Sequence, residues 1–139
     1  MTDLVRFSVS MDRALVERFD RQVAEKGYSS RSEAVRDLIR SSLVQEQWES
    51  EDTEAVGAIT LVYDHSRASL PEVLTETQHD SCDRIVASMH VHLDQHNCLE
   101  ILAVRGRARD LGALADRLIS TKGVKHGALV RTSGGADLR

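Results

Sequence analysis

The first forty residues are patterned as one short strand and two short helices, which cannot bury a core alone. Apolar and polar side chains alternate from Val5 to Met11, as in a strand with one buried face. Asp12 can cap a helix that Gly27 ends, and a capping-box sequence beginning at Ser30 opens a second helix. A lone strand with two short helices is not stable by itself. We therefore expect the strand to pair with that of a second copy, in an intertwined homodimer.

Charge divides the chain into two parts. Residues 1–44 carry eight Lys/Arg and seven Asp/Glu, whereas residues 45–139 carry ten and fifteen, within a formal net charge of −4. This balance argues against a protein that grips nucleic acid by bulk positive charge. Neither a membrane span nor a secretory leader is recognisable, so we expect a cytoplasmic protein in which Cys82 and Cys98 are reduced thiols.

The second part is patterned as strands and helices in the order βαββαβ. Strands are expected at 56–65, 84–93, 98–104 and 124–131, and helices at 69–78 and 110–120. This order is that of a split βαβ sandwich, with an antiparallel sheet and two helices. We therefore expect an α+β protein: a βαα unit at 1–46, a linker at 47–54, a βαββαβ domain at 55–132 and a disordered tail at 133–139.

Histidines and a cysteine in the second part have the spacing of a metal site. His90 and His92 are two apart on a predicted strand, so their side chains share a face and their Cα atoms lie about 7 Å apart. Cys98 follows a polar turn that brings the next strand alongside. Imidazole and thiolate donors suit zinc, copper or nickel, not calcium or magnesium.

Simpler interpretations stand beside this one. His90 and His92 alone could be an exposed strand face, and Cys98 could be a small buried apolar residue. Glu100, on the same strand face as Cys98, could support the ligands or be an ordinary surface residue.

Several motifs together resemble a known family. The N-terminal part is similar to a ribbon-helix-helix DNA-binding domain, and the C-terminal part resembles the ACT-like metal-binding domain of the nickel-responsive regulators NikR. The motifs are Tyr28–Arg40 (YSSRSEAVRDLIR), Val62–His65 (VYDH), Thr77–His79 (TQH), His90–His92 (HVH) followed by Cys98–Glu100 (CLE), and Gly123–Gly127 (GVKHG).

The resemblance implies a nickel-dependent transcriptional repressor that binds palindromic double-stranded operator DNA as a homotetramer, a dimer of dimers. It also implies one nickel ion per chain, in a planar site at a tetramer interface. The ligands would be His90, His92 and Cys98 of one chain and His79 of a facing chain. The sequence after His79 lacks the histidine run of some relatives and has Cys82 instead, whose role is open.

Two further sets of residues follow from the resemblance. Arg6, Ser8 and Ser10 would form the polar face of the paired ribbon and contact bases in the major groove, unless that face is merely solvated. Glu33 and Asp37 would help form a second cation site, for which potassium is the expected ion, unless they lie on an ordinary exposed helix face.

Other functions remain open. The chain could be an ACT-domain regulator that senses a small molecule such as an amino acid, although such a site would not need converging soft ligands. It could also sense another transition metal. We do not expect an enzyme, because no positioned general base stands beside an open coordination position and four protein ligands would close the site.

Overall fold

The structure is a computed structural model that describes residues 3–139. It divides into two compact units, one ending at Ser41 and one running from Ser42 to Arg139, and each is described by itself. The elements in chain order are α1 (Arg13–Glu25), α2 (Arg31–Glu49), β1 (Glu54–Asp64), α3 (Leu70–Asp80), β2 (Ile85–His92), β3 (Asn97–Arg107), α4 (Ala108–Ile119) and β4 (Val124–Thr132).

The helix boundaries of the first unit follow from their capping residues. The carboxylate of Asp12 accepts a 2.9 Å hydrogen bond from the backbone N–H of Ala14, which caps α1. Gly27 has φ +78°, a conformation that glycine adopts without steric cost, and it follows the end of α1. The hydroxyl of Ser30 accepts a 3.2 Å hydrogen bond from the N–H of Glu33 at the start of α2. The predictions for Asp12 and Gly27 are confirmed, and the Ser30 half of the capping box is formed, while the Glu33 side chain pairs with Arg36 instead.

The strand predicted at 5–11 is not formed in the single chain. Residues 3–12 have no helix or strand, and the alternating Val5, Phe7 and Val9 are 82%, 70% and 66% exposed. A strand needs a partner for its backbone N–H and C=O groups, and one chain offers none here. The apolar alternation is thus left without a core in the single chain, and its pairing with a second copy stays a prediction.

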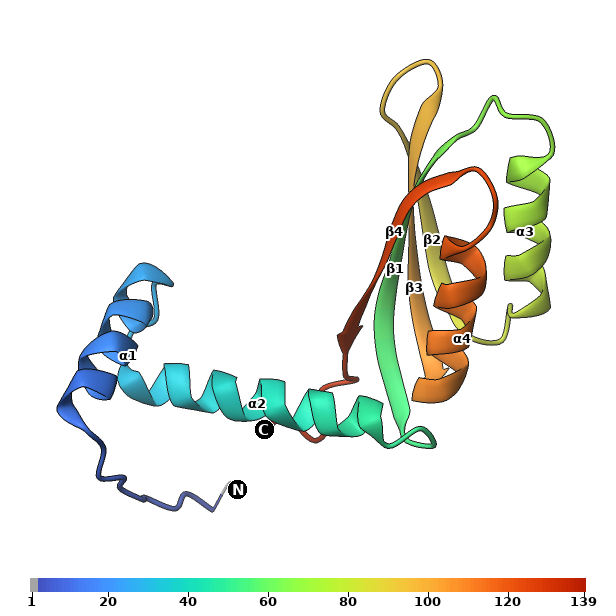
Figure 1. Cartoon of the computed structure of the whole chain (residues 1–139). Coiled ribbons are helices and arrows are strands. Elements are labelled where there is room, and N and C mark those ends of the chain that lie inside the picture. Colours follow the sequence, from blue (N-terminus) through green and yellow to red (C-terminus); the bar gives the residue numbers. More distant parts are fainter. Residues whose placement is uncertain (1–2) are drawn as a thin grey trace. The chain divides into compact units, whose positions relative to one another are not determined.

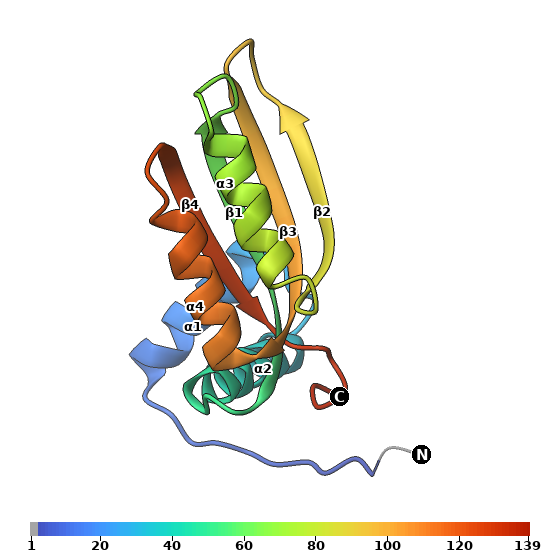
Figure 2. The ribbon, with the colours of Figure 1, turned by 90° about the vertical axis from the view of Figure 1, so that its right-hand side faces the viewer.

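The second unit is the predicted βαββαβ domain. Its four strands form an antiparallel sheet in the order β2-β3-β1-β4. Helices α3 and α4 lie on the same side of the sheet, as Figures 1 and 2 show. The other face of the sheet has no helix of this domain on it.

The core lies between the sheet and these two helices. Every second residue of β1 from Ala55 to Tyr63 is buried, and the alternation continues on β3. Most of these side chains are small and aliphatic, as the low aromatic content predicts. The buried apolar residues of this core are Ala55, Ile59, Leu61, Tyr63, Leu70, Leu74, Cys98, Leu102, Val104, Ala108, Leu111, Leu114, Ala115 and Leu118.

Some element boundaries differ from those expected. Helix α2 continues to Glu49, three residues into the stretch assigned to a linker, since Gln, Trp and Glu are compatible with a helix. Strand β3 extends to Arg107, because its pairing with β1 continues beyond Val104. Residues 133–139 contain a turn in which the N–H of Leu138 donates to the carbonyl of Gly135. None of the helices in residues 3–139 is long and apolar enough to span a membrane.

Candidate metal centre and nucleic-acid interface

The hairpin of β2 and β3 brings three of the proposed metal ligands to one face of the sheet. His92 lies opposite Cys98, and His90 lies opposite Glu100. Directly paired residues point to the same side of a sheet, so all four side chains share a face. It is the face that carries the core, because Cys98 is 2% exposed. The prediction that the two histidines and the cysteine share a face is confirmed.

The turn between the two strands is held by one carboxylate. Asp94 accepts hydrogen bonds from the side-chain amide of Asn97 at 2.9 Å and from the backbone N–H groups of His96 and Asn97 at 2.8 Å each. These bonds, that of the Asn97 side chain first, hold the pKa of Asp94 far below its usual range. The turn sets the register in which Cys98 faces His92.

A buried carboxylate lies beside the histidine pair. Glu100 is 1% exposed and accepts hydrogen bonds from the hydroxyl of Tyr63 at 2.8 Å and from the amide of Gln78 at 2.6 Å. His90 Nε2 lies 3.3 Å from Glu100 Oε2. Burial first, and then the bond to Glu100, raise the pKa of Tyr63. The interpretation of Glu100 as an ordinary surface residue is wrong.

The fourth proposed ligand lies on α3, next to a residue of this network. Gln78, which bonds to Glu100, directly precedes His79, whose side chain is exposed. Within residues 3–139 of one chain, no three His, Cys, Asp or Glu side chains converge closely enough to hold a metal ion. The chemistry of the donors still fits a borderline transition metal, because two imidazoles and a thiol share one face. The four-ligand site stays a prediction.

A second group of contacts joins the loop after β1 to the same hairpin. The N–H of His65 donates to the carbonyl of His96 at 2.9 Å, and Ser66 Oγ lies 3.3 Å from His96 Nδ1. The ring of His65 meets that of His92 edge to face, with centroids 5.1 Å apart. Sequence reasoning missed this contact, although the motif containing His65 had been singled out for the family resemblance.

The proposed DNA-contacting residues lie in the segment without secondary structure. Arg6, Ser8 and Ser10 are exposed in residues 3–12. Their common face would exist only after the segment pairs, so it stays a prediction.

The proposed second cation site has other partners within the first unit. Glu33 forms an ion pair with Arg36, one turn away. Asp37 accepts a hydrogen bond from the hydroxyl of Tyr28, and this bond raises the pKa of Tyr28. Both carboxylates therefore have the contacts of an ordinary helix face, and the cation site stays a prediction.

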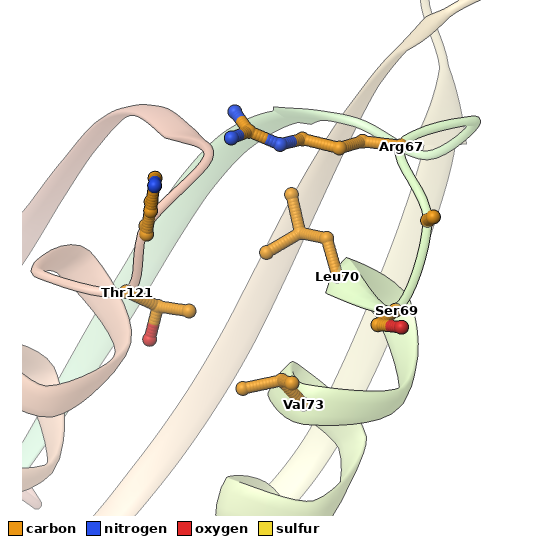
Figure 3. A pocket seen from close by; sticks show the side chains of 7 residues that line it. Arg67, Ser69, Leu70, Val73 and Thr121 are labelled. Carbon is orange, nitrogen blue, oxygen red and sulfur yellow. The ribbon is translucent and has the colours of Figure 1, made fainter.

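The second unit also has an open pocket of about 340 Å³ at the start of α3. Figure 3 shows Leu70 and Val73 on one side of it, with the guanidinium of Arg67 extending across its upper rim. It shares no residue with the proposed ligands. The lining residues are Arg67, Ala68, Ser69, Leu70, Val73, Thr121 and Lys122.

Models of known protein families match both halves of the chain. The family model described as the NikR C-terminal nickel-binding domain matches residues 56–132, and that of the ribbon-helix-helix protein, copG family, matches residues 5–46. The chain is 54% identical to a Geobacter sulfurreducens protein named "Putative nickel-responsive regulator" over 138 residues, 99% of each chain. The chain belongs to the NikR family. This is a family of transcriptional regulators with DNA-binding and nickel-binding domains, not of enzymes.

Other matches extend the NikR comparison. A protein of the same name from Thermococcus onnurineus is 52% identical over 135 residues, 97% of this chain and 98% of its own. An uncharacterized Thermotoga maritima protein of solved structure aligns with TM-score 0.51 and 18% identity, over 56% of this chain and 96% of its own. That likeness shows the fold alone.

Proposed function

We propose that this chain is a nickel-dependent repressor that binds operator DNA and acts in the cytoplasm, where that DNA is. The observation that carries the proposal is the register of β2 and β3. It puts His92 opposite the buried Cys98 and places His90 on the same face. Two imidazoles and a thiol in this arrangement are suitable donors for a transition metal, and the chain's relatives are named nickel-responsive regulators.

We propose that each chain binds one nickel ion through His90, His92 and Cys98, with His79 contributed by a facing chain. His79 is exposed on α3, where it is accessible to another copy. When bound, nickel would supply a cross-link between chains. Copper should bind such donors more tightly than nickel, so the selectivity must come from the coordination geometry that the assembled chains permit.

The proposed assembly is a homotetramer built from two ribbon-helix-helix dimers. Its support is apolar surface that the single chain leaves exposed. Phe7 and Val9 are exposed in the first unit, and Met89 and Val130 are 53% and 57% exposed on strands of the second. Large apolar side chains that are exposed together on one surface are typical of a protein–protein interface.

In the dimer, Arg6, Ser8 and Ser10 would be duplicated by the two-fold axis and contact a palindromic site in the major groove. The potassium site would draw on Glu33 and Asp37, which share one face of α2.

A metal titration with DNA binding as the readout tests the proposal. The metal-free full chain is first used with nickel to select a preferred duplex from a random pool. The dissociation constant for that duplex is then measured without metal, with nickel and with zinc. We expect one nickel per chain and tighter DNA binding with nickel than with zinc or no metal. Equal binding in all three conditions would overturn the proposal.

The same assay tests the small-molecule alternative, which the pocket at the start of α3 keeps open. Amino acids are added to the metal-free chain in place of nickel. If an amino acid tightens DNA binding and nickel does not, the chain is an ACT-domain sensor. Copper is tested in a further titration, and if zinc or copper tightens DNA binding and nickel does not, the chain is a sensor of that metal.

A further inference from the structure

Trp48, near the end of α2, is held by two contacts with β4 and by packing against the core. Its indole Nε1–H donates a 2.9 Å hydrogen bond to the backbone carbonyl of Thr132, the last residue of β4. The guanidinium carbon of Arg131 lies 5.6 Å from the ring centroid, within range of a cation–π interaction. The ring also packs against the core of the second unit.

Strand β1, the neighbour of β4 in the sheet, has a glycine beside this ring. A Cβ placed on Gly57 of β1 would stand 3.4 Å from Trp48 Cζ2 and 2.9 Å from the carbonyl oxygen of Val130. The absence of a side chain at Gly57 therefore lets the backbone of β4 approach β1 closely, while the indole lies at ordinary contact distance from the same position. All of these contacts lie within the second unit.

The helix that carries Trp48 is also the covalent connection between the two units. Helix α2 is continuous from Arg31 to Glu49, while the boundary between the units falls after Ser41. The turn after α2 is hydrogen-bonded to the start of α4. The backbone N–H of Ala108 donates to the carbonyl of Thr53, and that of Arg109 donates to the carbonyl of Glu51. The end of α2 is thus held by the Trp48 side chain and by the turn after it.

We propose that Trp48 is a positioning residue that fastens the end of α2 to the sheet, and that the response of DNA binding to nickel depends on it. This rests on the proposed function. The covalent path from the second unit to the DNA-binding unit runs through α2. Helix α2 can pass a displacement of the sheet to the DNA-binding unit only if its end moves with the sheet. An end that slides against β4 would pass on no displacement.

Three variants of the full chain test the proposal. Trp48→Ala removes all the contacts, and Trp48→Phe keeps an aromatic ring but loses the N–H donor. Gln45→Ala is the matched control, because Gln45 is exposed on the same helix and bonds only to the side chain of Glu49 among the described residues. Nickel stoichiometry, tetramer content and the dissociation constant for the selected duplex, with and without nickel, are measured for each.

We expect Trp48→Ala to bind nickel and to bind DNA without nickel as the wild type does. The nickel enhancement is the dissociation constant for the duplex without nickel divided by that with nickel. Allosteric coupling typically makes such a ratio about 5 to 150, and we expect it to fall close to one in Trp48→Ala. Trp48→Phe should keep part of the enhancement, and Gln45→Ala all of it. A wild-type enhancement in Trp48→Ala overturns the proposal, as does a loss of nickel binding that parallels the loss of response.

A measurement on the wild type covers the case in which Trp48→Ala does not fold. Trp48 is the only tryptophan of the sequence, so all the tryptophan fluorescence comes from the indole that contacts β4. We expect acrylamide to quench it weakly, and equally in the metal-free, nickel-bound and DNA-bound protein. Quenching as strong as that of free tryptophan in any state overturns the proposal. If the wild type shows no nickel enhancement at all, the proposed function fails and this inference fails with it.

Discussion

The hydroxyl of Tyr63 on β1 donates a 2.8 Å hydrogen bond to the carboxylate of Glu100 on β3, inside the core. Glu100 also accepts from Gln78 on α3. One buried carboxylate therefore joins two strands to the helix that carries His79, and its Oε2 lies 3.3 Å from Nε2 of His90. Buried carboxylates are tolerated only when they are well bonded, so this network ties the candidate metal ligands to the core.

Replacing Glu100 by Gln should destabilise the metal-free protein. Gln has nearly the same shape but no charge, so the bonds from Tyr63 and Gln78 become neutral ones, and one of the two partners must turn an acceptor toward its NH2 group. Hydrogen bonds to a charged group contribute about 1.5–3 kcal/mol and neutral ones about 0.5–1.5 kcal/mol, so we expect a loss of about 1 kcal/mol per bond. Urea unfolding measures the free energy of unfolding, with Glu76→Gln, exposed on α3, as the control. Equal stability of the two variants would contradict the assignment.

Replacing Cys98 by Ala should abolish the sulfur-to-nickel charge-transfer absorption of the nickel-loaded protein. The reason is that Cys98 is the thiol opposite His92. Cys82→Ser is the matched control, because Cys82 is an exposed free cysteine outside the hairpin. Absorption spectra during a nickel titration give the result. If the band survives in Cys98→Ala but disappears in Cys82→Ser, the thiolate ligand is Cys82 and not Cys98.

Replacing Asp94 by Ala should destabilise the protein at neutral pH and to a smaller extent in acid. The folded-state pKa of Asp94 is depressed by its hydrogen bonds, so the stability it contributes is present above its unfolded pKa of about 3.9. That contribution is lost as the pH falls from there toward the folded pKa. Thermal unfolding should therefore show a difference in melting temperature between wild type and variant that is smaller at pH 3 than at pH 7.

The control for that measurement is Asp80→Ala, an exposed aspartate outside the turn. A gap for Asp94→Ala that stays constant with pH would mean that the carboxylate does not hold the turn.

Replacing Arg6 by Ala should weaken operator binding and relax its sequence preference. A good arginine-to-base contact is worth about 1–3 kcal/mol, and it discriminates at one position of each half-site. Competition between the selected duplex and single-base variants measures the preference. If binding weakens equally for every sequence, Arg6 contacts phosphate and not a base.

The local structure of this chain could be predicted because it depends on short-range chemistry. The caps of Asp12 and Ser30 act on N–H groups two or three residues away, so they show in the sequence. The strand spacing of His90 and His92 sets their common face in the same way.

The buried partners of Glu100 could not be predicted, because Tyr63 and Gln78 are 37 and 22 residues away along the chain. The same holds for Trp48, whose bond to Thr132 spans 84 residues. Such contacts depend on which strands become neighbours, and the order β2-β3-β1-β4 decided this. Residues 3–12 show the reverse case: their alternation is plain in the sequence, but a strand forms only where a partner supplies its hydrogen bonds.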